Sequence, residues 1–472
     1  RLTDVTGVQT CALPILPFPS TLTLGKHIDC VPVIHGRCIF AQESRKYFLE
    51  KNYQCIAVEL PPSLGPSVVE AVSYLPQITA VVYRDLQEHC YVPVEPGEAI
   101  MEAIRLGTQE RAVIEFVDME LDVLPDYETI LPDEYAIQKI GLPGYYEKVF
   151  PLLPQARPGS VQDQREVWMA TKLRELEARF SRILFVCGMA HLEGVRRHFK
   201  KVRKPERVEK PDYTPRIFAV HPDSIYLLTG EIPYITFLYE KTRYAMDMKE
   251  FEKTDGIKEV LLETRKEYCR DFPEEQELLS PGSMQSLLNY LRNLCLIQSR
   301  LTPSMYDLAV ASQGVGGSGF GSRVIEMAKF YPYQDPLSPL PVIRIGIGKG
   351  WFEPEGEVDL KNRLPGPPYA LKSLRLEKRP RLEKKEKWKR HWGSNSECSW
   401  PEEDERIENF TRHVRLKALG LMGEDQAKVQ KFTSSIKDGL DIRETLRQWH
   451  TGEVYRSEER RVGKECRSWW AP

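Results

Sequence analysis

The chain has 472 residues, which is enough for roughly two to four domains of ordinary size. Hydrophobic residues make up 41% of it and charged residues 28%, a composition that is typical of a folded globular protein and excludes a disordered or fibrous one. The formal net charge of −2 provides no basic field, so we do not expect a nucleic-acid partner. The apolar runs are too short to cross a bilayer and no signal-peptide pattern begins the chain, so we expect no membrane span.

The cysteines favour a reducing compartment. Ten are present, scattered along the chain without CxxC pairs. Several fall inside strand-like apolar runs, where a free cysteine packs as a small hydrophobic residue. This usage predicts a cytoplasmic location.

Both ends of the chain resemble translated sequencing adapter. Residues 456–460 (RSEER) can be encoded by the word AGATCGGAAGAGC, and the reverse complement of that word encodes residues 12–15 (ALPI). One nucleotide word on opposite strands would account for both termini. We therefore expect residues 1–15 and 456–472 to lie outside the natural fold, and the last natural domain to be cut short. Genuine disordered tails are the alternative.

Short apolar runs alternate with helical segments in the first half of the chain. Buried strands are expected at 29–35, 54–59, 78–83, 112–118 and 183–188. Helices are expected at 39–51, 66–74, 96–106, 162–180 and 194–201, with a helical insertion or lid at 124–158. The alternation predicts an α/β domain over residues 25–210, with a mainly parallel sheet that helices cover on both faces.

The rest of the chain predicts three further regions. Residues 211–345 are expected to form a mostly helical domain, with helices at 281–299, 304–312 and 323–330. Residues 346–397 are rich in proline and basic residues and predict a linker. Residues 398–455 predict a small C-terminal module, which offers a surface for a protein partner.

Three other motifs have structural explanations that we favour. The glycine-rich segment 314–322 (GVGGSGFGS) follows a predicted helix instead of a strand and has no P-loop lysine, which favours a flexible loop over a phosphate site. Glutamates interrupt the basic run 372–390, which favours a solvated linker over a nucleic-acid contact. Residues 437–450 favour a salt-bridged exposed helix over an anion site or an interface.

Polar side chains stand just after four of the predicted strands. These are His35, Glu59, Asp118 and His191, and Glu98 stands at the start of a predicted helix. Functional groups in open α/β sheets gather beyond the C-terminal ends of the strands. Imidazole and carboxylate are ligands of Zn, Mn, Fe or Co, so the set predicts a metal site. Helix capping or solvent exposure would explain each residue taken alone.

The motifs around these residues are similar to those of the TraB (pheromone-shutdown) family, within the broader group that includes Tiki, GumN and the erythromycin-esterase/ChaN-like proteins. The matching pieces are His35 after its strand, VELP with Glu59, PGEAIMEAIRLG with Glu98, DQREVWMATKL with Arg165, and CGMAHLEG with the GxxH histidine His191. Two positions depart from the family pattern. Pro32 stands where the first GxxH has its glycine, and Met119 stands where the family usually has arginine.

The resemblance implies chemistry at the ends of the parallel strands. In Tiki-like relatives the GxxH histidines and the strand-end glutamate are implicated in divalent-metal proteolysis. Erythromycin-esterase relatives imply ester hydrolysis instead, and ChaN-like relatives imply haem binding. The resemblance therefore implies the fold more firmly than any one of these activities.

We expect a metal-dependent hydrolase that acts on a peptide or small-molecule substrate. The expected metal ligands are His35, Glu59, Asp118 and His191. Glu59 or Glu98 would act as the base, and Arg165 would stabilise an oxyanion or orient a carboxylate. The alternative is a non-catalytic protein that holds haem or another small ligand through His35 and His191. Either site requires the side chains after the strands to converge within about 8 Å, given metal–ligand bonds of about 2 Å.

Overall fold

The computed structural model of the chain describes residues 22–84, 89–121, 131–203, 205, 213–245, 251–366, 374 and 376. The chain divides into two compact units, residues 1–379 and 380–472. The second unit lies outside the described residues, as do both adapter-like segments, most of the basic run, the C-terminal module and the segment 437–450. The expectations for these parts stay predictions.

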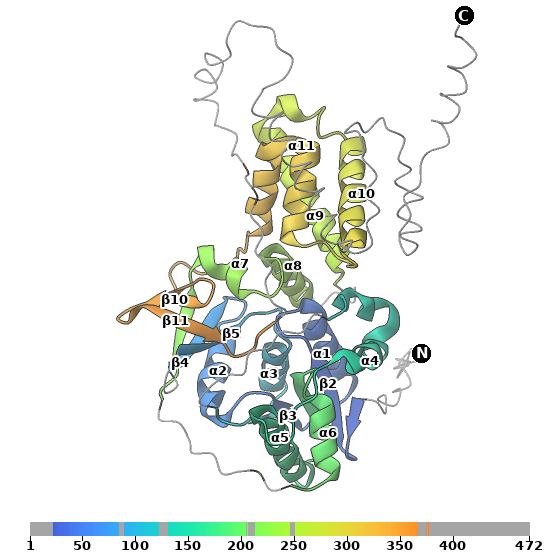
Figure 1. The fold of residues 1–472 in the computed structure, drawn as a ribbon. Coiled ribbons are helices and arrows are strands. Elements are labelled where there is room, and N and C mark those ends of the chain that lie inside the picture. The colour runs from blue at the N-terminus through green and yellow to red at the C-terminus, as the bar shows by residue number, and fades with distance from the viewer. Residues whose placement is uncertain are drawn as a thin grey trace, which may run out of the picture. The chain divides into compact units, whose positions relative to one another are not determined.

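Five strands form a mostly parallel sheet, in the order β1-β2-β7-β3-β6. Figure 1 labels β2 and β3 of this sheet among the helices of the same part of the chain. The strands are β1 (Thr23–Leu24), β2 (Ile28–Val33), β3 (Cys55–Val58), β6 (Val113–Phe116) and β7 (Ile183–Gly188). The pairs β2–β7, β7–β3 and β3–β6 are parallel, and the short β1 is antiparallel to β2. Parallel pairing of four expected strands is thus confirmed.

Six helices accompany these strands along the chain. They are α1 (Cys38–Glu50), α2 (Gly65–Val72), α3 (Ala99–Gln109), α4 (Ile137–Val149), α5 (Val161–Glu177) and α6 (Leu192–Lys200). Short 3₁₀ turns are η2 (Pro62–Leu64), η3 (Glu134–Ala136), η4 (Phe150–Leu152), η5 (Pro222–Ser224) and η6 (Pro273–Glu275). The five helices expected at 39–51, 66–74, 96–106, 162–180 and 194–201 are confirmed to within a few residues at each end. Of the insertion or lid expected at 124–158, the described residues contain η3, α4 and η4.

The central strand β7 is covered on both faces. All six of its residues are buried, and successive side chains of a strand point to opposite faces of the sheet. Helix α1 packs against α3, which contacts β3, β6 and β7, and α5 packs against α6. Residues from both helix pairs and from the strands belong to one hydrophobic core. Burial of this kind is typical of parallel sheets.

A second sheet has six strands and closes on itself, because its first and last strands pair. In sheet order β10-β11-β5-β4-β8-β9, the strands are β10 (Lys349–Phe352), β11 (Gly356–Asn362), β5 (His89–Val94), β4 (Thr79–Arg84), β8 (Arg216–Val220) and β9 (Val342–Ile345). The strand expected at 78–83 is therefore not part of the parallel sheet. It is antiparallel to both β5 and β8. The pairing with β5 is the one that a short connection between consecutive strands imposes.

The second sheet also corrects the expected linker over 346–397, because β10 and β11 lie inside that range. The side chains of β10 alternate between exposed and buried, and β11 has a single fully buried residue. No continuous apolar run therefore marks these strands in the sequence. The side chains of Phe352 and Leu360 lie in a separate, smaller hydrophobic core, together with residues of β4, β8 and β9.

The remaining helices lie between β8 and β9. They are α7 (Ile225–Leu228), α8 (Pro233–Tyr244), α9 (Lys253–Asp271), α10 (Pro281–Ile297) and α11 (Met305–Ala328). The loop expected at 314–322 is wrong, because α11 continues through it with one break at Gly317, whose φ is 77°. Phe320 is fully buried against neighbouring helices, and this packing outweighs the low helix propensity of glycine. Within the described ranges, no helix is long and apolar enough to cross a membrane.

Candidate functional site

Three of the expected site residues meet around Gly188, the last residue of β7. His35 follows β2, Glu59 follows β3 and His191 follows β7, and β7 lies between the other two strands. A methyl group placed on Gly188 would lie 3.1 Å from Glu59 Oε2, 3.2 Å from His35 Nε2 and 3.5 Å from His191 Cδ2. The three side chains thus converge as expected. A side chain at position 188 would occupy the space between them.

Glu59 and His191 form a buried ion pair. Glu59 Oε1 lies 2.9 Å from His191 Nε2, and Glu59 Oε2 accepts the backbone N–H of Gly188 at 2.5 Å. Burial opposes the charge on Glu59, but His191 and Arg165 outweigh it and hold the pKa of this carboxyl well below its ordinary value. Burial likewise opposes a proton on His191, yet the charge of Glu59 outweighs it and raises the pKa of His191.

Glu98 orients His35. The Glu98 carboxylate caps α3 by accepting the Ile100 N–H, and it also accepts the Gly36 N–H at 2.6 Å. The same carboxylate lies 3.1 Å from His35 Nδ1. Burial lowers the pKa of His35, but the charge and hydrogen bond of Glu98 outweigh that effect, so the pKa is raised. No described residue hydrogen-bonds His35 Nε2, which faces Gly188.

Asp118 is held by two arginines. Arg165 donates from Nε to Oδ1 at 3.1 Å and from Nη2 to Oδ2 at 2.8 Å. Arg363 Nη2 donates to the same Oδ2 at 2.7 Å. Burial opposes the charge on Asp118, but the two guanidinium groups outweigh it and hold its pKa below the ordinary value. Both carboxylate oxygens face arginines, so this geometry favours an anchoring role over the metal-ligand role that the sequence predicts.

Arg165 connects Asp118 to the ion pair of Glu59 and His191. Its Nη2 lies 2.8 Å from Glu59 Oε1, and its Nη1 donates to Gln162 Oε1 at 3.2 Å. These bonds direct the guanidinium group at carboxylates. Of the two roles expected for Arg165, the geometry favours orienting a carboxylate over stabilising an oxyanion.

Sequence reasoning misses three residues of this arrangement. Gln162 Nε2 lies 2.8 Å from His191 Nδ1, and Glu166 Oε1 lies 3.7 Å from the same nitrogen. Both lie within one helical turn of Arg165, so a helical-wheel projection of α5 could identify them as neighbours of Arg165. Arg363 gives no such signal, because it follows β11, a strand with a weak sequence pattern.

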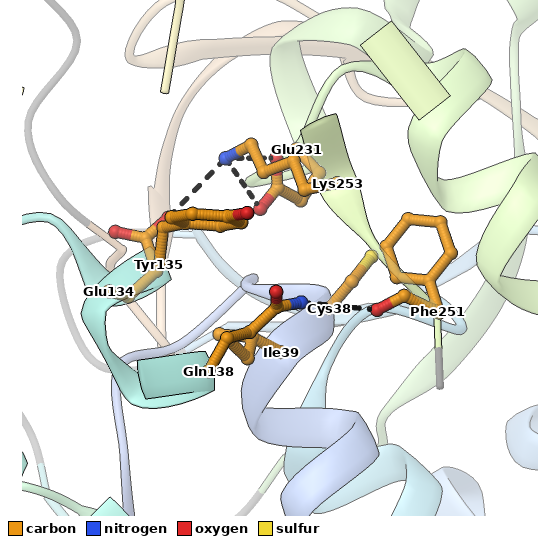
Figure 2. A pocket seen from close by; sticks show the side chains of 8 residues that line it. All are labelled: Cys38, Ile39, Glu134, Tyr135, Gln138, Glu231, Phe251 and Lys253. Atoms are coloured by element: carbon orange, nitrogen blue, oxygen red, sulfur yellow. Dashed lines mark hydrogen bonds and ion pairs between the residues drawn. The ribbon is translucent and has the colours of Figure 1, made fainter. Parts of the chain in front are cut away.

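A pocket lies beside the loop that carries His35 (Figure 2). Its lining residues are Cys38, Ile39, Glu134, Tyr135, Gln138, Glu231, Phe251 and Lys253. Figure 2 shows the Lys253 ammonium between two carboxylates, 2.9 Å from Glu231 Oε2 and 3.4 Å from Glu134 Oε1. Arg37 Nε lies 3.5 Å from Glu134 Oε1. Two cations thus face two anions, and this balanced network joins α1, η3 and the starts of α8 and α9.

Helices α5 and α6 carry a second group of ionisable side chains close to His191. Asp163, Glu166 and His198 offer ligand atoms that all lie within 4.8 Å of one another. In the part of the chain that the structure describes, no other group of three or more histidine, cysteine or acidic residues meets this spacing. The expected ligands around Gly188 are therefore close together but less tightly clustered than these three.

Comparisons with known proteins name no family for this arrangement: no protein-family model, no curated protein and no solved structure matches the chain. The resemblance to TraB and its relatives stays a prediction that rests on the motifs of the sequence.

Proposed function

We propose that the chain is a hydrolase of ester or amide bonds, with its reaction centre at His35, Glu59 and His191. The convergence of these three side chains around Gly188 is the observation that carries the proposal. Two imidazoles and a carboxylate at the ends of adjacent parallel strands suit both proton transfer and metal binding. His35 is 10% exposed, which makes it the most accessible of the three side chains.

The donor set fits a divalent ion. His35 presents an Nε2 that no described residue hydrogen-bonds, while Glu98 holds its Nδ1, and a carboxylate behind an imidazole is the usual support for a metal-bound histidine. His35, His191 and Glu59 would hold the ion, which would polarise a carbonyl group and acidify a water molecule. Asp118 is left out of this set because arginines donate to both of its oxygens, whereas on Glu59 an arginine donates to Oε1 alone.

The protein side chains have distinct tasks in this proposal. Glu98 keeps the Nδ1 proton on His35, so that the Nε2 lone pair is free to take a proton or hold a cation. Glu59 holds His191 in place, and Gln162 contacts the other ring nitrogen. Arg165, anchored on Asp118, neutralises Glu59 within a buried site.

Haem binding receives less support from the same geometry. His191 Nε2 already contacts Glu59, and His35 Nε2 packs close to the Gly188 backbone. A porphyrin would need open space above one of these nitrogens. We therefore favour the hydrolase over the ligand-binding alternative.

The test is hydrolysis of p-nitrophenyl esters and fluorogenic peptides by the full chain, with and without added Mn²⁺ or Zn²⁺. We expect His35→Ala and Glu59→Gln to abolish turnover. His221→Ala is the matched control, because this histidine precedes η5 as its N-cap and contacts exposed Asp223 and Arg344. Equal turnover in the wild type and in both site variants would contradict the proposal.

A further inference from the structure

A buried acidic cluster lies on the other side of His191 from Glu59. Asp163 and Glu166 are three residues apart on α5, so they share one face of the helix, and His198 reaches them from α6. Asp163 and Glu166 are each 2% exposed, and His198 is 9% exposed. The 2.7 Å between His198 Nε2 and Asp163 Oδ1 is close to the roughly 3 Å that separates two ligands on one ion when metal–ligand bonds are about 2 Å.

Glu166 supplies an independent sign of a missing ligand. Its Oε2 is buried, accepts no hydrogen bond from any described residue and has Arg197 Nη2 at 3.5 Å, although a buried carboxylate oxygen is costly to leave without a donor. The same side chain lines a pocket together with the apolar residues Phe150, Leu153, Pro154 and Ala156. Gly194 keeps this arrangement possible, because a Cβ at position 194 would lie 1.8 Å from Glu166 Oε2.

The cations that now face the cluster are loosely held. Arg197 lies 3.5 Å from both Asp163 Oδ1 and Glu166 Oε2, and its side chain is 42% exposed. Arg203 donates to Asp163 Oδ2 at 2.9 Å, and its side chain is 51% exposed. Both guanidinium groups border solvent, so they can turn to water when an ion takes over their charge beside the carboxylates.

We propose that Asp163, Glu166 and His198 form a second site, which binds a divalent transition-metal ion such as Mn²⁺ or Zn²⁺. Two carboxylates and one imidazole suit these ions, and solvent would complete the coordination through the pocket beside Glu166. Asp163 already accepts the Gly159 N–H, which fixes its orientation. The site does not depend on the proposed hydrolase activity.

The second site is coupled to the first through Glu166, whose Oε1 lies 3.7 Å from His191 Nδ1. An ion on Glu166 would draw negative charge away from His191. The two proposed sites are therefore neighbours that share the Glu166 side chain as their connection.

The test is equilibrium dialysis of the full chain against Mn²⁺ and Zn²⁺, with the bound metal counted per chain. Asp163→Asn and His198→Gln should each weaken binding at this site at least tenfold. Glu193→Gln is the matched control, because Glu193 lines the same pocket, is 42% exposed and lies outside the cluster. Arg203→Ala should strengthen binding, because it removes a competing cation.

His35→Ala separates this inference from the proposed function. Binding that survives His35→Ala and is lost in Asp163→Asn supports the second site, whatever the fate of the hydrolase. Binding that is lost in His35→Ala and survives Asp163→Asn overturns the second site and leaves the first in place. Absence of binding in both the wild type and Arg203→Ala overturns it as well. If Asp163→Asn unfolds, broadening of the His198 ring resonances by Mn²⁺ in the wild type decides the question, because broadening supports the site and unaffected resonances overturn it.

Discussion

Replacing Arg363 by methionine removes the cation that reaches the site from the second sheet. Arg363 follows β11, is 2% exposed in its side chain, and donates to Asp118 Oδ2 at 2.7 Å and to the Met119 carbonyl at 3.3 Å. Methionine keeps most of the apolar length of the side chain, so the loss is mainly electrostatic. Asp118 is fully buried and would retain Arg165 alone.

The expected cost follows from these contacts. Breaking a buried ion pair by removing one partner typically costs about 3–5 kcal/mol. Asp118 keeps the two hydrogen bonds of Arg165, so we expect a value at or below the lower end, about 2–3 kcal/mol. That loss corresponds to a roughly 30- to 150-fold change in the ratio of folded to unfolded protein.

Urea denaturation of the full chain measures this change, followed by circular dichroism. Arg344→Met is the matched control, because Arg344 also belongs to the closed sheet but is 55% exposed and lies 3.8 Å from an 80% exposed Asp223. We expect the control to change stability little. Equal destabilisation by the two substitutions would refute the argument that Arg363 stabilises the site through Asp118.

Further predictions concern the charges around the two histidines and the pocket of Figure 2. Glu98→Gln should lower the pKa of His35 in an NMR titration, because burial then outweighs the remaining charges. Glu95→Gln is the control and should leave it unchanged, since the charges that shift the pKa of His35 are those of Glu98, Glu59 and His191. The raised pKa of His35 stabilises the fold fully below the ordinary value of 6.5, and this contribution should be lost as the pH rises through the raised value. The lowered pKa of Glu59 gives the opposite limb, whose contribution is present above the ordinary 4.5 and is lost as the pH falls towards the lowered value. A urea midpoint that does not fall above pH 6.5 would contradict the first expectation, and one that does not fall below pH 4.5 would contradict the second. Lys253→Met should cost about 2–4 kcal/mol in urea denaturation, because two buried carboxylates lose their shared cation, and a change below about 0.5 kcal/mol would show that the network is not stabilising.

The parallel sheet and the convergence of its strand ends are predictable from sequence. Runs such as 183–188 are apolar at every position, which is the signature of a strand buried on both faces, and a polar residue follows each of them. Parallel strands place such residues on one edge. That is why His35, Glu59 and His191 are found together without any knowledge of the structure.

The second sheet is not predictable in the same way. Strand β5 contains Pro93, β10 is four residues long and alternates in exposure, and β11 pairs with β5 across more than half of the chain. Local patterns do not encode which distant strands pair. The contact of Arg363 with Asp118 therefore cannot be predicted from the sequence, since only the pairing of β11 with β5 brings the two residues together.

The role of Asp118 shows a different limit. A carboxylate at a strand end is equally suited to a metal ion and to an arginine, and the residue type alone does not choose between them. The choice depends on Arg165 and Arg363, which come from a helix and from the second sheet. The glycine-rich segment 314–322 shows the same limit. Its residue types predict a loop, but packing around Phe320 makes most of it helical.

The most direct test of the site around Gly188 is its metal content when the second site is disabled. The chain carrying Asp163→Asn would be loaded with Zn²⁺ or Mn²⁺, dialysed and analysed for bound metal beside the same chain with His35→Ala, His191→Ala or the control His221→Ala. We predict one ion per chain in the parent and in the control, and loss of that ion in the other two. An ion that survives both His35→Ala and His191→Ala, or a parent that binds none, would contradict a metal-dependent site built from these histidines.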